Sequence, residues 1–109
     1  MNMLLMWNES NEAIGENKIR LALLSGDWIP IDLPAKFYSI FTDANLISLG
    51  GATEASIWSN YFEVSLPLQE DWNSIPYGYP LTNQLFKIID KRGRSCPINV
   101  KGELIIEGE

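Results

Sequence analysis

A threonine and a glutamate, Thr53 and Glu54, stand side by side after a short glycine-rich stretch. A threonine hydroxyl can donate to a phosphate oxygen, and a carboxylate supplies the hard oxygen that Mg²⁺ prefers. Gly50, Gly51 and Ala52 precede the pair, and paired glycines let a backbone turn sharply and let a ligand come close. The pattern is typical of a nucleotide and magnesium site, with a solvated glycine-rich turn as the alternative.

Gly26 and Asp27 form a second candidate turn. They follow an apolar run at residues 18–25, which predicts a strand buried on both faces. A helix is predicted at residues 35–43 and another buried strand at 46–49, and this order favours a parallel pair with a right-handed crossover. Both glycine turns then lie at the carboxyl edge of one sheet, where ligands bind. The alternative is that Asp27 only caps its own turn.

The remaining elements divide the chain into pieces. A helix is expected at residues 2–13, and strands at 84–90 and 103–107 are expected to pair antiparallel across a turn at 91–94. The predicted fold class is α/β, a parallel strand–helix–strand layer followed by antiparallel β strands of a barrel-like subdomain. The expected division is an α/β layer at 1–60, an irregular connection at 61–77 and a β piece at 78–109.

Composition excludes several classes of function. The 109 residues suffice for one small domain or part of a larger one, and the abrupt end suggests a piece of a longer polypeptide. A net charge of −6 argues against nucleic acid, and the absence of histidine excludes histidine-based catalysis within this segment. No apolar run is long enough to span a membrane. The single cysteine, Cys96, fits a reducing, cytoplasmic compartment and a structural role.

Four motifs in order resemble those of adenylate-forming enzymes, and most closely the adenylation domains of nonribosomal peptide synthetases. Such domains carry a Gly-Gly-Glu-like turn, a Gly-Pro-Thr-Glu motif, an Ile-Pro-x-Gly-x-Pro-x-x-Asn segment and a Gly-Glu-Leu-x-Ile-x-Gly strand. The corresponding segments here are Ser25-Gly26-Asp27, Gly51-Ala52-Thr53-Glu54, residues 75–83 and residues 102–108. The match covers most of this chain but about a fifth of a full adenylation domain, so we expect a part of such a domain.

The resemblance implies roles for the residues of both turns. Thr53 would contact the ATP phosphates, and Glu54 would help to hold Mg²⁺; these two are the implied catalytic residues. Two positions depart from the family pattern, because Gly50 replaces a tyrosine whose ring stacks on adenine and Ala52 replaces the proline. The implied nucleotide-binding set is Gly26, Asp27, Gly50, Gly51, Ala52 and Thr53.

The resemblance also implies a substrate pocket. The stretches around Ser25 and Thr53 resemble a subgroup associated with heterocyclising modules, which make thiazoline or oxazoline rings in siderophores and related peptides. In that subgroup the pattern of large apolar side chains resembles the pocket of cysteine-activating domains. Shape alone leaves serine and alanine open, because one methylene changes such a pocket by only ~1–3 kcal/mol. The implied pocket residues are Leu23, Ser25, Leu49, Ile57 and Trp58.

The resemblance finally bounds the activity of the segment. Its implied partners are an amino acid, a peptidyl carrier protein and neighbouring synthetase domains. The Gly-rich phosphate loop, the ribose-binding aspartate and the catalytic lysine of the family are absent, so this segment alone is expected to be inactive and to pair with copies of itself. Two alternatives are a stand-alone acyl- or aryl-acid ligase and a non-catalytic acidic interaction module.

Overall fold

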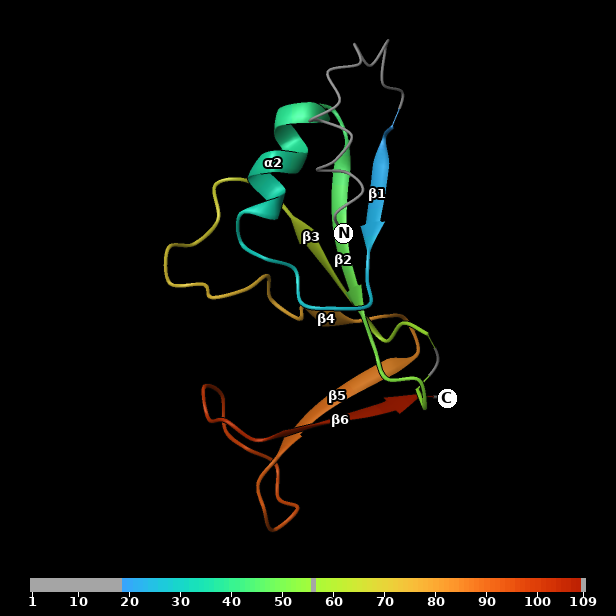
Figure 1. The fold of residues 1–109 in the computed structure, drawn as a ribbon. Helices are drawn as coiled ribbons and strands as arrows, with labels where there is room; N and C mark the ends of the chain where they lie inside the picture. The colour runs from blue at the N-terminus through green and yellow to red at the C-terminus, as the bar shows by residue number, and fades with distance from the viewer. Residues whose placement is uncertain (1–18, 56, 109) are drawn as a thin grey trace.

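The structure is a computed structural model that describes residues 19–55 and 57–108, so the helix expected at residues 2–13 lies outside the described residues. The described chain forms a four-stranded sheet with one helix and, beside it, a two-stranded ribbon (Figure 1). The elements are β1 (Leu21–Leu24), α2 (Leu33–Ile40), β2 (Asn45–Gly50), β3 (Asn60–Val64), β4 (Tyr79–Pro80), β5 (Gln84–Ile89) and β6 (Glu103–Gly108).

The parallel strand–helix–strand unit predicted from the sequence is confirmed. β1 and β2 pair in parallel, with Leu23 opposite Ile47, and α2 connects them. Pro34 lies in the first turn of α2, where a missing N–H costs no helical hydrogen bond. The helix ends at Ile40, and the N–H of Phe41 donates to the carbonyl oxygen of Phe37 at 2.9 Å. This unit brings the carboxyl ends of β1 and β2 to the same edge of the sheet.

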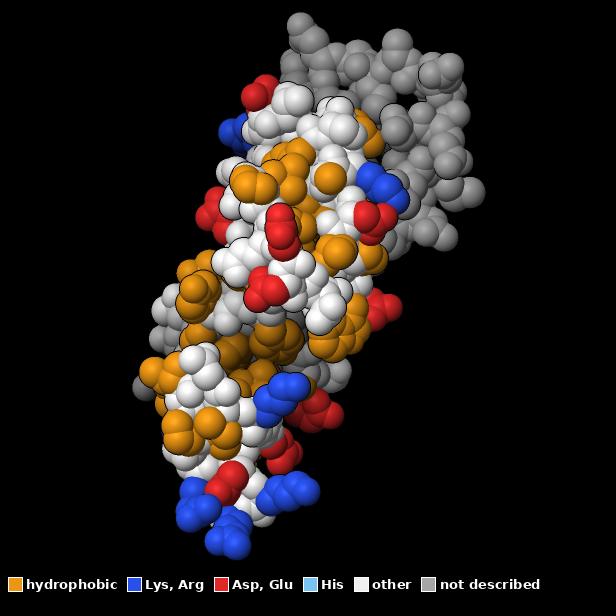
Figure 2. Space-filling view, turned by 90° about the vertical axis from the view of Figure 1, so that its left-hand side faces the viewer, with side chains coloured by type: hydrophobic (Ala, Val, Ile, Leu, Met, Phe, Trp, Pro, Cys, Tyr) orange, Lys and Arg blue, Asp and Glu red, His pale blue; other side chains and the backbone are white. Residues whose placement is uncertain are grey.

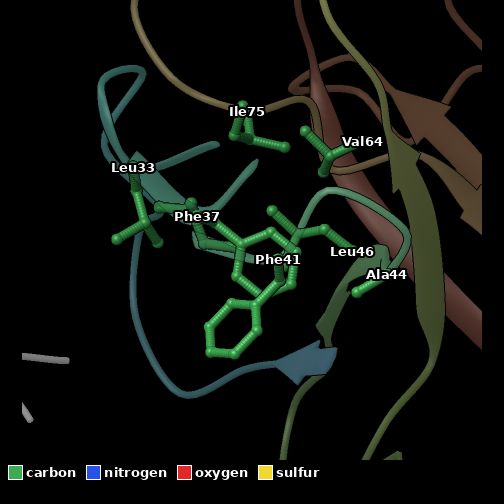
Figure 3. Packing of buried hydrophobic residues seen from close by; sticks show 8 residues of the cluster. Leu33, Phe37, Phe41, Ala44, Leu46, Val64 and Ile75 are labelled. Atoms are coloured by element: carbon green, nitrogen blue, oxygen red, sulfur yellow. The ribbon is translucent and has the colours of Figure 1, made fainter. Parts of the chain in front are cut away.

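The hydrophobic core lies between α2 and one face of the sheet (Figure 3). Phe37 projects from the helix toward Leu46 of β2 and Val64 of β3, and the latter two are almost completely buried. Burying each such side chain contributes about 1.5–3 kcal/mol, so this face anchors the sheet. The core cluster consists of Ile29, Leu33, Phe37, Phe41, Ala44, Leu46, Val64 and Ile75.

The prediction that the first strand is buried on both faces is wrong for the described chain. Leu21 and Leu23 of β1 are 51% and 48% exposed, whereas Ala22 and Leu24 pack against the core. Side chains alternate between the faces of a strand, and α2 covers only one face. Apolar side chains are therefore exposed on the face opposite the helix.

The irregular connection predicted at residues 61–77 needs a correction at its start. β3 occupies Asn60–Val64 and pairs antiparallel with β2, and β4 then pairs antiparallel with β3. In β3 the side chains of Tyr61 and Glu63 are exposed, whereas Asn60 and Val64 are buried. This alternation of burial is that of a strand. The sequence shows it poorly, because the buried Asn60 is polar and the exposed Tyr61 is aromatic.

The antiparallel pairing of the last two strands is confirmed. β5 and β6 pair from Gln84 with Gly108 to Ile89 with Glu103, and within the described residues they form an open ribbon and not a closed barrel. The four-stranded sheet ends with β4 at Pro80, and β5 and β6 form a sheet of their own. The domain division given above stays a prediction. In the described part of the chain, no helix combines the length and the apolarity needed to cross a membrane.

Candidate functional site

The glycine-rich turn leaves the end of β2 and returns at the start of β3. The N–H of Ser59 donates to the carbonyl oxygen of Gly50 at 2.7 Å, and the N–H of Ala55 donates to that of Ala52 at 2.9 Å. A Cβ added at Gly51 would lie 2.8 Å from the backbone nitrogen of Ser59. A side chain therefore has no room at Gly51, and the turn is closed tightly at its base.

Thr53 and Glu54 lie on the exposed part of this turn. Among the described residues, no three acidic, cysteine or histidine side chains gather as a metal cage. Mg²⁺ at nucleotide sites commonly uses one or two carboxylates and takes its other ligands from phosphates and water. The exposed carboxylate of Glu54, with the hydroxyl of Thr53 beside it, fits that requirement.

The second turn lies at the same edge of the sheet. Gly26 has φ +100°, a conformation that glycine adopts readily, and the carboxylate of Asp27 accepts a 2.7 Å hydrogen bond from the N–H of Trp28. Because β1 and β2 are parallel, this turn and the turn after Gly50 both follow carboxyl ends of strands. The local cap of Asp27 and its place at the candidate site are thus compatible.

Two of the predicted pocket residues are joined by a hydrogen bond. The indole N–H of Trp58 donates to the hydroxyl oxygen of Ser25 at 3.1 Å across the two turns. Leu23 of β1 and Leu49 of β2 lie on the sheet face opposite α2, as their register and alternation require. Ile57 is 80% exposed. The structure thus brings Ser25 and Trp58 together, whereas the side chain of Ile57 is mostly exposed.

Two residues beside the site are missed by the sequence analysis. Asn60 is 1% exposed, and its side-chain N–H donates to the carbonyl oxygen of Tyr77. Tyr77 begins the tight bend at Gly78, which has φ +85°. The glycine between two tyrosines signals a bend at this point, but the pairing of Asn60 with a residue 17 positions away leaves no trace in the local sequence.

Comparison with protein families gives a match to the family described as AMP-binding enzyme over residues 1–109. The chain belongs to this family. The expectation of an adenylation-domain segment of the nonribosomal peptide synthetase type is confirmed. The chain is 49% identical over 109 residues to the anguibactin system regulator of Vibrio anguillarum, covering 99% of this chain and 10% of that protein. It is 53% identical over 90 residues to bacitracin synthase 1 of Bacillus licheniformis, covering 83% of this chain and 2% of that protein.

Solved structures of adenylation domains have the same fold. The nonribosomal peptide synthetase FmoA3 in its alpha-methyl-L-serine-AMP bound form matches with a TM-score of 0.89 and 33% identity, over 99% of this chain and 12% of that chain. Its AMPPNP bound form matches with a TM-score of 0.87 and 34% identity, over 96% of this chain and 11% of that chain. The chain thus matches only a small part of each of these proteins.

Proposed function

We propose that this chain is part of a domain that joins an amino acid to ATP, giving aminoacyl-AMP and pyrophosphate, and then passes the aminoacyl group to a carrier-protein thiol. The observation that carries the proposal is the shared sheet edge: two glycine turns, one bearing Thr53 and Glu54, follow neighbouring parallel strands. The fold match to FmoA3 in its alpha-methyl-L-serine-AMP bound form supports this assignment.

In this proposal the turn after β2 holds the phosphates of ATP. The hydroxyl of Thr53 donates to a phosphate oxygen, and the backbone at Gly50, Gly51 and Ala52 lets the nucleotide approach closely. Glu54 would hold Mg²⁺, which offsets phosphate charge when bound. Gly26 and Asp27 flank the nucleotide from the neighbouring strand end.

The proposed amino acid is cysteine, bound by the five pocket residues of the heterocyclising subgroup. The 3.1 Å hydrogen bond from the Trp58 indole to the Ser25 hydroxyl supports the proposal, because it would hold the large ring at the wall of the proposed pocket. A fixed ring of this size shortens the pocket and favours a small side chain. We place this chemistry in a reducing, cytoplasmic compartment, which also suits the free thiol of Cys96.

The test is amino-acid-dependent ATP–pyrophosphate exchange by the full-length protein that carries this chain. Cysteine is expected to give the dominant signal in a panel of amino acids and aryl acids. Glu54→Gln removes the magnesium carboxylate and should lower the exchange rate on the order of 100-fold, as removal of one stabilising electrostatic contact does in other active sites. Glu63→Gln, an exposed carboxylate on β3, is the matched control and should leave the rate unchanged.

Three other outcomes separate parts of the proposal. A dominant signal from another amino acid would keep the reaction and overturn the cysteine pocket. A signal from aryl acids alone would replace amino-acid activation by acid-ligase activity. No exchange from a folded protein with any acid would overturn the proposed reaction itself.

A further inference from the structure

The end of β2 lies against an aromatic ring from a distant segment. A Cβ added at Gly50 would lie 3.0 Å from Cε2 of Tyr77 and 2.8 Å from Oδ1 of Asn60. The contact with Asn60 is shorter than real Cβ atoms show, and the contact with Tyr77 is tighter than nearly all of them, so the ring would have to shift by a few tenths of an ångström. The space beside position 50 is therefore filled by the ring of Tyr77 and by the buried amide of Asn60, and not by a side chain of β2.

The backbone of Tyr77 is fixed from two sides. Its carbonyl oxygen accepts the side-chain N–H of Asn60, which is 1% exposed, and the next residue, Gly78, packs so tightly on β3 that a Cβ there would lie 2.8 Å from Cβ of Phe62. The ring of Tyr77 leans on Phe86 of β5, with ring centroids 5.9 Å apart and an interplanar angle of 32°. These contacts hold the backbone of Tyr77 and support its ring on one side, beside Gly50.

The same ring remains open to a ligand. Tyr77 is 45% exposed, although Asn60 binds its carbonyl oxygen and Phe86 packs against its ring. The Tyr77 ring lies beside Gly50, the last residue of β2. The turn that follows Gly50 carries Thr53, the proposed phosphate contact. A nucleotide whose phosphates lie at Thr53 would extend its base back toward the strand end, and a fixed aromatic face is a favourable surface for a base.

We propose that Tyr77 is a binding residue for ATP, with its ring as the stacking surface for the adenine base beside Gly50. This inference rests on the proposed function, because it takes the turn after β2 as the phosphate site. Asn60 acts through Tyr77 and is a positioning residue. The phenol oxygen has no part in stacking, so the aromatic ring alone carries the effect.

The test compares Tyr77 with Tyr79 in pyrophosphate exchange by the full-length protein. Tyr77→Ala should raise the KM for ATP about tenfold, the loss expected for one base–aromatic contact, with an unchanged KM for the amino acid. Tyr77→Phe should keep the wild-type KM for ATP. Tyr79→Ala is the matched control, because Tyr79 is 64% exposed, lies two residues away and packs on Tyr61, not at Gly50. That variant should leave the KM for ATP unchanged.

The outcomes distinguish this inference from the function on which it rests. Equal KM values for ATP in Tyr77→Ala and the wild type, with exchange still sensitive to Glu54→Gln, would overturn the stacking role and keep the proposed function. If neither substitution changes exchange, the proposed site itself fails. Should Tyr77→Ala not fold, Tyr77→Leu keeps the bulk without the aromatic face and must show the same raised KM for ATP.

Discussion

At the scale of single residues, the hydrogen bond from Trp58 to Ser25 gives the Ser25 hydroxyl a positioning role in the proposed pocket. Ser25 accepts from the indole N–H and so holds the larger side chain in place. Its contribution to substrate selection in the proposed pocket then runs through the position of Trp58. A serine at such a place need not touch the substrate to influence which substrate binds.

Removing that hydroxyl should loosen the pocket selectively. Ser25→Ala deletes one hydrogen bond worth about 0.5–1.5 kcal/mol, which corresponds to a roughly 2- to 10-fold higher KM for cysteine. The KM for ATP should stay unchanged. Ser25→Thr keeps the hydroxyl and is the control. Steady-state pyrophosphate exchange measures both constants, and an unchanged KM for cysteine in Ser25→Ala would remove this role from Ser25.

Local sequence predicts some of these residues and is silent about others. Thr53, Glu54 and Asp27 follow glycine turns at strand ends, and that signal lies within a few neighbouring residues. Asn60 and Tyr77 acquire their roles only when distant segments meet, because the partner of each lies far along the chain. Tyrosines in a proline-rich stretch predict only packing until the fold places one of them beside Gly50.

At the scale of elements, the spacing of apolar residues along the chain predicts β1, α2 and β2 but not β3 or β4. The apolar runs that form β1 and β2 and the proline at the start of α2 predict the crossover unit, with boundaries shifted by one to three residues. β3 is missed because it is only five residues long and its pattern is irregular, with a polar residue, Asn60, at a buried position and an aromatic residue, Tyr61, at an exposed one. β4 has two residues and exists only because β3 offers it a partner.

The turn after β5 is organised by one carboxylate. Asp90 accepts hydrogen bonds from the N–H of Arg94 and the N–H of Arg92, and its other oxygen pairs with the Arg94 guanidinium at 2.9 Å. The hydrogen bond from the N–H of Arg94 is the largest cause that lowers the pKa of Asp90 below its ordinary value of 3.8. Desolvation opposes it, and the N–H of Arg92 and the Arg94 side chain lower the pKa further. Figure 2 shows several Lys and Arg side chains at this end of the molecule and others farther from it.

The lowered pKa of Asp90 predicts a pH dependence of definite sign. A carboxyl whose pKa falls on folding stabilises the turn above its unfolded pKa, and this contribution is lost as the pH falls through the folded pKa. In the full-length protein, the amide signals of Arg92 and Arg94 should therefore shift with a midpoint below 3.8. In Asp90→Asn this titration should disappear, whereas in Asp71→Asn it should persist. A midpoint at or above 3.8 in the wild type would contradict the hydrogen-bonded turn.

At the scale of the whole molecule, within residues 19–55 and 57–108 the four-stranded sheet is covered by α2 on one face and carries exposed apolar side chains on the other. Leu21 and Leu23 of β1 are half exposed, and within the described residues β1 pairs only with β2. An apolar edge strand of this kind is a template for pairing with another chain.

The 109-residue chain alone should therefore self-associate. Light scattering over a range of concentrations is expected to show dimers or larger species, and Leu21→Lys should shift the distribution toward monomer by placing a charge on the edge strand. Leu85→Lys on β5, where Leu85 is 50% exposed, serves as the control for added charge elsewhere. A monomer at every concentration would show that the β1 edge does not mediate self-association.

The close packing at Gly50 has a consequence for evolution as well as for binding. Because the Tyr77 ring fills the space beside Gly50, a bulky residue at position 50 and a large ring at position 77 exclude each other. A substitution at position 50 alone overpacks the site, and the loss of the ring at position 77 alone leaves it empty. Position 50 and position 77 should therefore covary among related sequences, with large paired against small, although 27 residues separate them in the chain.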